Sequence, residues 1–197
     1  MKRHLHLLLA ASFGAMSIGA SAADWTATRI GPFNNQGFAV VDINNAGQVL
    51  GQYAPDPFTL RGFLYTPGSS GGLVDLGSFG GRGTIPTALN ASGQVAGWSE
   101  TSDGFAHGFI FKDGRMQRLS LAGEMMGNAT DINDRGQVLV HSTSADSVGR
   151  DAIFHPAGPP TVLSVPTGSG SAGAPLGPQG INISGQVLPK LPSRCGV

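Results

Sequence analysis

The sequence has little cysteine, little charge and few aromatic residues. Cys195 is its 1 cysteine, so no disulfide within the chain can stabilise the fold. Charged residues make up 12%, with 12 basic and 12 acidic side chains, and no basic cluster stands out. This balance gives no electrostatic attraction to nucleic acid or to an anionic membrane, so we expect no nucleic-acid partner. Gly and Pro are frequent instead, with 31 and 13 residues, and we expect many turns.

The longest apolar stretch lies at the start of the chain, over residues 5–15. Lys2 and Arg3 precede it, and small residues ending at Ala22 follow it. This order predicts a secretory signal peptide, residues 1–22, cleaved near Ala22, and the stretch is too short for a membrane span. No later segment is apolar enough to cross a bilayer, so we expect a mature protein in the periplasm or outside the cell. Without the leader it carries 10 basic and 12 acidic residues, a formal charge of −2.

The pattern Asn-x-x-Gly-Gln-Val occurs four times along the chain. Its asparagines lie 46, 43 and 49 residues apart, and self-similarity at such a period is typical of repeat architectures. Asn favours the first position of a type I turn, where its side chain caps the backbone amide two residues on. Gly favours the fourth, where φ is positive, so each copy predicts a β-hairpin. The turn residues are Asn44, Gly47, Asn90, Gly93, Asn133, Gly136, Asn182 and Gly185.

A calcium loop is the alternative interpretation of this pattern. Asp42 and Asp131 each lie two positions before a repeated asparagine, as in an Asp-x-Asn run of calcium ligands. Such a loop needs another oxygen ligand two positions beyond the asparagine, where the chain has Ala46 and Arg135. Turn formation is therefore favoured, and we expect no metal or other cofactor.

Further strand-like stretches follow each hairpin at matching distances, after a predicted break at residues 55–57 in the first copy. Four short antiparallel strands in each stretch of about 46 residues match the size of a propeller blade. A β-sandwich would use similar strands without requiring this regularity. We therefore predict an all-β, propeller-like repeat protein of antiparallel four-stranded units, incomplete at about three and a half units. Third strands are expected at 61–65, 107–111 and 151–155, fourth strands at 73–77, 116–121 and 161–165, the repeat domain at 23–187, and an irregular C-terminal tail at 188–197.

Together these segments have the look of a known family. The hairpin pattern, His-Gly-Phe-Ile-Phe at 107–111 and Asp-Leu-Gly-Ser-Phe-Gly-Gly at 75–81 resemble the HAF family of bacterial extracellular repeat proteins. The resemblance covers most of residues 37–187 and implies a secreted chain of β-repeats; it brings no activity or site residue. Two copies depart from the family pattern, since Arg61 and Asp151 replace the histidine of the third strand.

Several catalytic patterns occur without the context that they require. Residues 68–72 match G-x-S-x-G, but that nucleophile elbow needs a following helix, and a strand is predicted instead. Residues 168–173 match G-x-G-x-x-G, but nearby prolines oppose the helix that would bind a dinucleotide. His107 and His155 lack metal-ligand spacing, so we expect packed imidazoles.

The favoured function is a secreted, non-enzymatic binding or structural surface module. Tyr53 and Trp98 follow the second strand in two copies and form the candidate ligand surface, because an aromatic ring can stack on a sugar. The loops at 55–58 and 100–106 would face the partner. That partner is an unknown extracellular ligand or protein, with carbohydrate as one class.

Two other hypotheses remain open at this stage. The first is a secreted hydrolase or lyase acting on polysaccharide. Gathering of Asp56, Glu100 and Asp103 in one pocket, with raised carboxylate pKa values, would favour it. The second is a truncated fragment without independent function, which would self-associate through open sheet edges.

Overall fold

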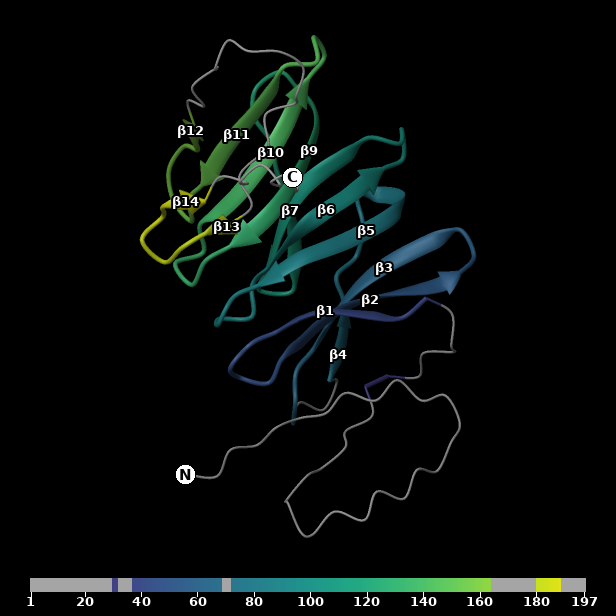
Figure 1. Ribbon diagram of the computed structural model, residues 1–197. Coiled ribbons are helices and arrows are strands. Elements are labelled where there is room, and N and C mark those ends of the chain that lie inside the picture. Colours follow the sequence, from purple (N-terminus) through teal and green to yellow (C-terminus); the bar gives the residue numbers. More distant parts are fainter. Residues whose placement is uncertain (1–29, 32–36, 69–71, 164–179, 189–197) are drawn as a thin grey trace, which may run out of the picture.

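The computed structural model of the chain is all-β. It describes residues 30–31, 37–68, 72–163 and 180–188. These residues form fourteen strands and no helix, which confirms the predicted fold class (Figure 1). Within them there is accordingly no helix long and apolar enough to cross a membrane.

Several predicted features lie outside the described residues. These are the signal peptide at 1–22, the Gly-rich stretch at 168–173, the centre of the G-x-S-x-G stretch, and all but the first residue of the tail at 188–197.

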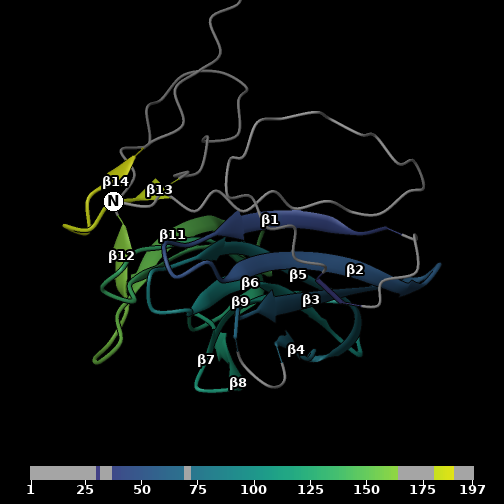
Figure 2. The same cartoon turned by 90° about the horizontal axis from the view of Figure 1, so that it is seen from below.

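The strands form three antiparallel meanders and a final hairpin. We call β1–β4, β5–β8 and β9–β12 the first, second and third sheets; a parallel residue pair, Leu60 with Gly83, links β3 to β5. Figure 1 shows the sheets following one another, with β13–β14 beside the third, and Figure 2 shows β1 to β4 in sequence across the first. The strands are β1 (Ala39–Ile43), β2 (Val49–Asp56), β3 (Thr59–Tyr65), β4 (Leu73–Asp75), β5 (Gly80–Leu89), β6 (Val95–Thr101), β7 (Ala106–Lys112), β8 (Arg115–Leu119), β9 (Glu124–Ile132), β10 (Val138–Ser144), β11 (Gly149–Phe154), β12 (Thr161–Leu163), β13 (Gly180–Ile181) and β14 (Val187–Leu188).

The expected third and fourth strands are present, with shifts of a few residues at their ends. The break predicted at 55–57 begins later than expected: β2 continues through Pro55 to Asp56, and the turn to β3 lies at Pro57 and Phe58. A register shift between Tyr53 and Asp56 interrupts the pairing with β3 there, and such an irregularity tolerates a residue without an amide hydrogen.

Each hairpin turn has the predicted geometry. The asparagine Oδ1 of each copy accepts hydrogen bonds from the amides two and four residues on, at 2.9–3.1 Å. The amide of the glycine donates to the asparagine carbonyl. The four glycines, at positions 47, 93, 136 and 185, have φ of 75°, 79°, 72° and 81°. This confirms the predicted positive φ, which glycine adopts without steric strain.

The core consists of apolar layers between successive sheets. Phe109 of the second sheet is fully buried in the layer shared with the first sheet, and Val140 of the third in the layer shared with the second. Burial of a large side chain of this kind contributes about 1.5–3 kcal/mol. A smaller cluster joins the third sheet to the final hairpin through Ile181. Stacking of sheets through their faces therefore holds the fold together.

Polar links run along the hairpin end of this stack. The Nδ2 group of Asn44 donates to the carbonyl of Asn90 at 3.0 Å, Asn90 to that of Asn133 at 3.1 Å, and Asn133 to that of Asn182 at 2.8 Å. We call these four residues the asparagine ladder. In the described residues the sheets do not close into a ring, and the propeller-like arrangement remains a prediction.

Candidate functional site

Tyr53 and Trp98, the predicted ligand surface, lie in different environments. Trp98 is eight residues beyond its hairpin asparagine and Tyr53 is nine beyond its own, so strand alternation places them on opposite faces. The Tyr53 hydroxyl donates to Asp75 Oδ2 at 2.8 Å, and its ring centroid lies 6.4 Å from that of Phe63. Burial and the hydrogen bond to Asp75 raise the pKa of Tyr53. Tyr53 therefore packs within its own sheet and does not share a surface with Trp98.

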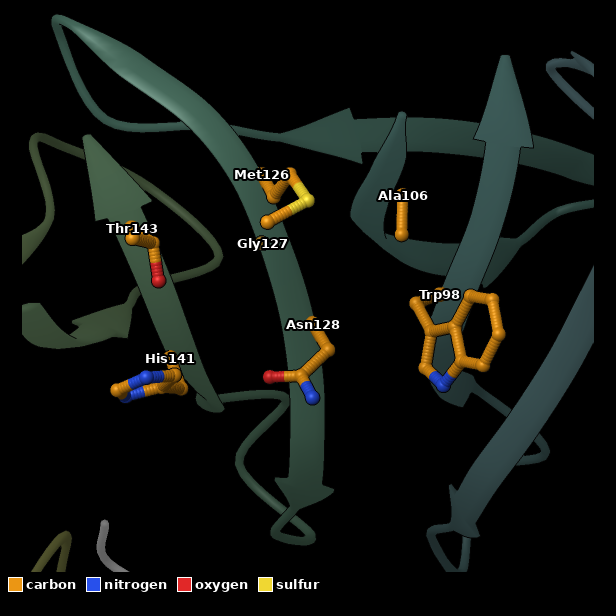
Figure 3. A pocket seen from close by; sticks show the side chains of 7 residues that line it. All are labelled: Trp98, Ala106, Met126, Gly127, Asn128, His141 and Thr143. Carbon is orange, nitrogen blue, oxygen red and sulfur yellow. The ribbon is translucent and has the colours of Figure 1, made fainter. Parts of the chain in front are cut away.

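Trp98 borders a hollow between the second and third sheets, which we call the Asn128 hollow. Its volume is about 300 Å³. Figure 3 shows Trp98 and Ala106 on one side, with residues of β9 and β10 on the other. The β9 and β10 residues are Met126, Gly127, Asn128, His141 and Thr143.

Trp98 also borders a second hollow, between the first and second sheets, which we call the Arg82 hollow. Its volume is about 370 Å³. The turn between β2 and β3 contributes Phe58, which is 75% exposed, and β5 and β6 contribute Arg82 and Glu100. The Arg82 guanidinium carbon lies 6.0 Å from the Phe58 ring centroid, within the range of a cation–π contact. Glu100 accepts a hydrogen bond from the amide of Gly83 at 3.0 Å.

The two hollows occupy the same place in two consecutive pairs of sheets. In each, the sheet that follows contributes residues at four matching positions counted from its hairpin asparagine: seven and five before it, and eight and ten after it. The matched pairs are Gly83 and Met126, Ile85 and Asn128, Trp98 and His141, and Glu100 and Thr143. Trp98 borders both hollows because it belongs to the sheet between them.

The Asn128 hollow contains a polar atom without a partner. Asn128 Oδ1 is buried and has no hydrogen-bond partner among the described residues, and Figure 3 shows it directed toward His141. An unsatisfied buried carbonyl costs about 1–3 kcal/mol, so a donor from outside the protein would stabilise this site. His141 Nδ1 lies 2.7 Å from Asp151 Oδ1 on β11, so this edge of the imidazole faces β11 and not Asn128. The hollow therefore offers an unpaired acceptor, Asn128 Oδ1, near an indole.

The carboxylates named for a hydrolase do not gather at either hollow. The Phe58 amide donates to Asp56 at 2.8 Å, and this bond lowers the pKa of the exposed Asp56. The hydroxyl of Thr101 does the same for Asp103. A general acid needs a raised carboxylate pKa, so both directions are opposite to the one that catalysis requires.

The remaining polar candidates link strands and sheets. His107 Nδ1 lies 3.2 Å from Glu124 Oε1, with side chains 6% and 1% exposed, and this pair connects the second sheet to the third. His155 contacts Gln137 and Thr161. In the part of the chain that the structure describes, no three His, Cys, Asp or Glu side chains form a group that could hold a metal ion.

The calcium-like aspartates also have backbone partners. Asp42 accepts from the amide of Leu89 at 3.0 Å and Asp131 from that of Ile181 at 2.8 Å, so each carboxylate ties one hairpin to the next.

Asn128 was not predicted from the sequence as a residue of the site. Its equivalent in the second copy is Ile85, and a polar residue at a position that is apolar elsewhere was the available signal. Comparison with family models, curated proteins and solved structures finds no match for this chain.

Proposed function

We propose that the protein is a secreted, non-enzymatic binding module that holds a neutral, hydroxyl-rich ligand, a carbohydrate, in the Asn128 hollow. The observation that carries the proposal is the unpaired carbonyl of Asn128 in a hollow bordered by Trp98. The propeller-like stacking of HAF-like repeat units and the signal peptide at 1–22 belong to the same proposal. They are supported by the recurring hairpins and by the apolar leader.

The ligand class follows from the chemistry of the lining groups. Asn128 Oδ1 accepts hydrogen bonds, and sugar hydroxyls donate them. The indole of Trp98 offers an apolar surface for the C–H face of a sugar ring. One stacked ring and a few hydrogen bonds make a weak site for a single sugar, and the adjoining Arg82 hollow gives a longer chain room to extend.

The alternative, a hydrolase or lyase on polysaccharide, requires two carboxyl groups facing one bond, about 5–9.5 Å apart. Among the described residues, Glu100 is the carboxylate that lines either hollow, and its neighbours there are Arg82 and Phe58. Binding without cleavage is therefore the better-supported function.

Tryptophan fluorescence tests the proposal. The chain has 2 tryptophans, Trp25 and Trp98, so Trp25→Phe leaves Trp98 as the reporter. We expect the Trp98 fluorescence to change and saturate as neutral cello-, malto- or chito-oligosaccharides are added. The length of the oligosaccharides should stay the same over prolonged incubation. Trp98→Ala abolishes binding in calorimetry, and Asn128→Leu weakens it about tenfold, the equivalent of 1.4 kcal/mol.

Tyr53→Phe is the matched control, because Tyr53 lies on the opposite face of its strand. A folded wild-type chain that binds none of these saccharides contradicts the proposal, as does equal loss of affinity in the Tyr53 variant. Shortening of the oligosaccharides would instead support the hydrolase.

A further inference from the structure

Within the described residues, the asparagine ladder has no further link before Asn44 or after Asn182. Each of its links joins an Nδ2 donor on one hairpin to the carbonyl of the asparagine on the next. At the start, the Asn44 carbonyl accepts from the Gly47 amide, and no preceding asparagine reaches it within the described residues. At the end, Asn182 Nδ2 donates to Gln186 of its own hairpin, and the described chain offers it no further carbonyl. One end thus presents a carbonyl acceptor and the other an amide donor.

Burial shows that the first hairpin lacks a neighbour that the other hairpins have. The residue just before the asparagine is 8% exposed at Leu89, 6% at Ile132 and 7% at Ile181, but 48% at Ile43. These four residues have the same place in the same turn. A preceding hairpin covers the later three residues, and no hairpin of the described chain precedes the first.

The glycine of each turn shows the same difference. A Cβ on Gly93, Gly136 or Gly185 would lie 2.7, 2.9 or 3.1 Å from the glutamine Oε1 of the preceding hairpin. At Gly47 the nearest neighbour is Pro67 of its own sheet, at 3.4 Å. The side of Gly47 that would receive a preceding glutamine is therefore open in the described chain.

We propose that the hairpin β1–β2 is the docking surface for the hairpin β13–β14 of a second copy of this chain. Asn182 Nδ2 of one copy donates to the Asn44 carbonyl of the next, and Ile43 is covered as its three equivalents are. Two features identify the occupant: the contact continues an interface already present three times, and the donor at one end matches the acceptor at the other. Ile183, which is 51% exposed on the turn of the last hairpin, adds apolar area to the contact.

The contact is restricted to the hairpin end of the first sheet. Phe38 already stacks on Phe63 at 5.5 Å between ring centroids, so the chain itself covers another part of that sheet. The docking is a stacking of faces and is distinct from the strand-edge pairing expected from sequence. Because the two surfaces differ, the contact is heterologous and builds a ring or an open stack.

Sedimentation velocity of the mature full-length chain over about 1–200 μM tests this proposal, with association expected to rise with concentration. Ile43→Asp changes an exposed side chain, and Asn182→Asp keeps both turn-capping acceptors while removing the donor. Each variant alone is expected to raise the apparent dissociation constant at least about tenfold with an unchanged circular-dichroism melt. Val74→Asp, on β4 and 45% exposed, is the control and leaves association unchanged.

Mixing the two variants gives the decisive measurement. The Ile43→Asp copy keeps an intact last hairpin and the Asn182→Asp copy an intact first hairpin, so the mixture forms a dimer although each variant alone stays monomeric. A wild-type chain that is monomeric throughout overturns the proposal, as does a mixture that fails to dimerise. Association that Val162→Lys on the edge strand β12 weakens, and the two hairpin variants do not, would assign it to edge pairing and also overturn it.

Discussion

At the scale of single residues, close contacts between sheets decide which side chains are tolerated. Gly97 on β6 lies where a Cβ would be 2.3 Å from the Ile85 carbonyl oxygen and 2.8 Å from Phe109 Cζ. Backbone cannot move aside as the end of a flexible side chain can. Glycine is therefore required at position 97 because there is no room for a Cβ, and not because of its backbone conformation, since its φ is not in the left-handed region.

Gly97→Ala is expected to destabilise the fold by about 2–3 kcal/mol, because the methyl group overpacks this contact. Urea unfolding followed by circular dichroism measures the loss. Gly149→Ala is the control: its Cβ would meet only the partly exposed His141 ring, at 3.3 Å, and we expect a change within about 0.5 kcal/mol. Equal losses in both variants would show that steric contact is not the cause.

Tyr53 is expected to titrate above the ordinary tyrosine pKa, because burial and Asp75 favour the neutral phenol. The chain has 2 tyrosines, so Tyr65→Phe isolates Tyr53 in an ultraviolet absorbance titration of the phenolate. Asp75→Asn should bring the pKa of Tyr53 down toward the ordinary value. The contribution of this group to stability is full below the unfolded-state pKa and is lost as the pH rises through the higher folded-state pKa. A Tyr53 titration that Asp75→Asn leaves unchanged would contradict this account.

At the scale of elements, the hairpins differ in how much their asparagines stabilise. Asn90 is 3% exposed and makes four side-chain hydrogen bonds, including the link to Asn133. Asn182 has the same turn but is exposed and lacks a link to a following hairpin in the described chain. The same substitution should therefore have different costs at the two ends of the ladder.

Asn90→Ala is expected to cost about 3–4 kcal/mol, since it leaves the partly buried amides of Ser92 and Gln94 and the buried Asn133 carbonyl without this partner, and Asn182→Ala about 1 kcal/mol or less. Chemical denaturation of both variants in the mature chain gives the comparison. Similar losses at the two positions would mean that the turn, and not the link between hairpins, provides the stability.

The elements also show what the sequence could predict. The turns follow from local chemistry, because Asn and Gly at fixed positions satisfy backbone groups within the same few residues. The link from Asn44 to Asn90 could not be predicted, since turn chemistry carries no information about a hairpin 46 residues away. Strand β5 contains Gly80, Gly81, Gly83 and Pro86, which have low strand propensity, and packing between sheets stabilises it instead.

The candidate site was predicted only in part, for a similar reason. Trp98 was predicted from its residue type together with Tyr53, but a shift of one residue along a strand reverses the face, so the two rings point to opposite faces of their sheets. Asn128 comes into contact with the site only when the third sheet stacks on the second. Residues that one strand contributes could thus be recognised, and residues that two sheets bring together could not.

At the scale of the whole molecule, stacked sheets with short polar links give a fold whose two hollows lie between sheets. Both hollows are formed in the gaps between consecutive sheets, and Trp98 is shared by the two gaps. The number of such hollows therefore rises with the number of gaps. A chain with more sheets would therefore have more hollows of this kind.

The direction of the asparagine ladder has a consequence for how such a gene can change. The two internal hairpins, at Asn90 and Asn133, each accept a bond through the backbone carbonyl and donate one through the side-chain amide. Such a hairpin needs a neighbour on each side, but any hairpin with the same asparagine can serve. A duplicated unit inserted between two hairpins finds a donor on one side and a carbonyl on the other. When a unit is deleted, the two hairpins on either side of it still present a side-chain donor and a backbone carbonyl that match. The array can therefore lengthen or shorten by whole units during evolution while each remaining turn keeps its hydrogen bonds.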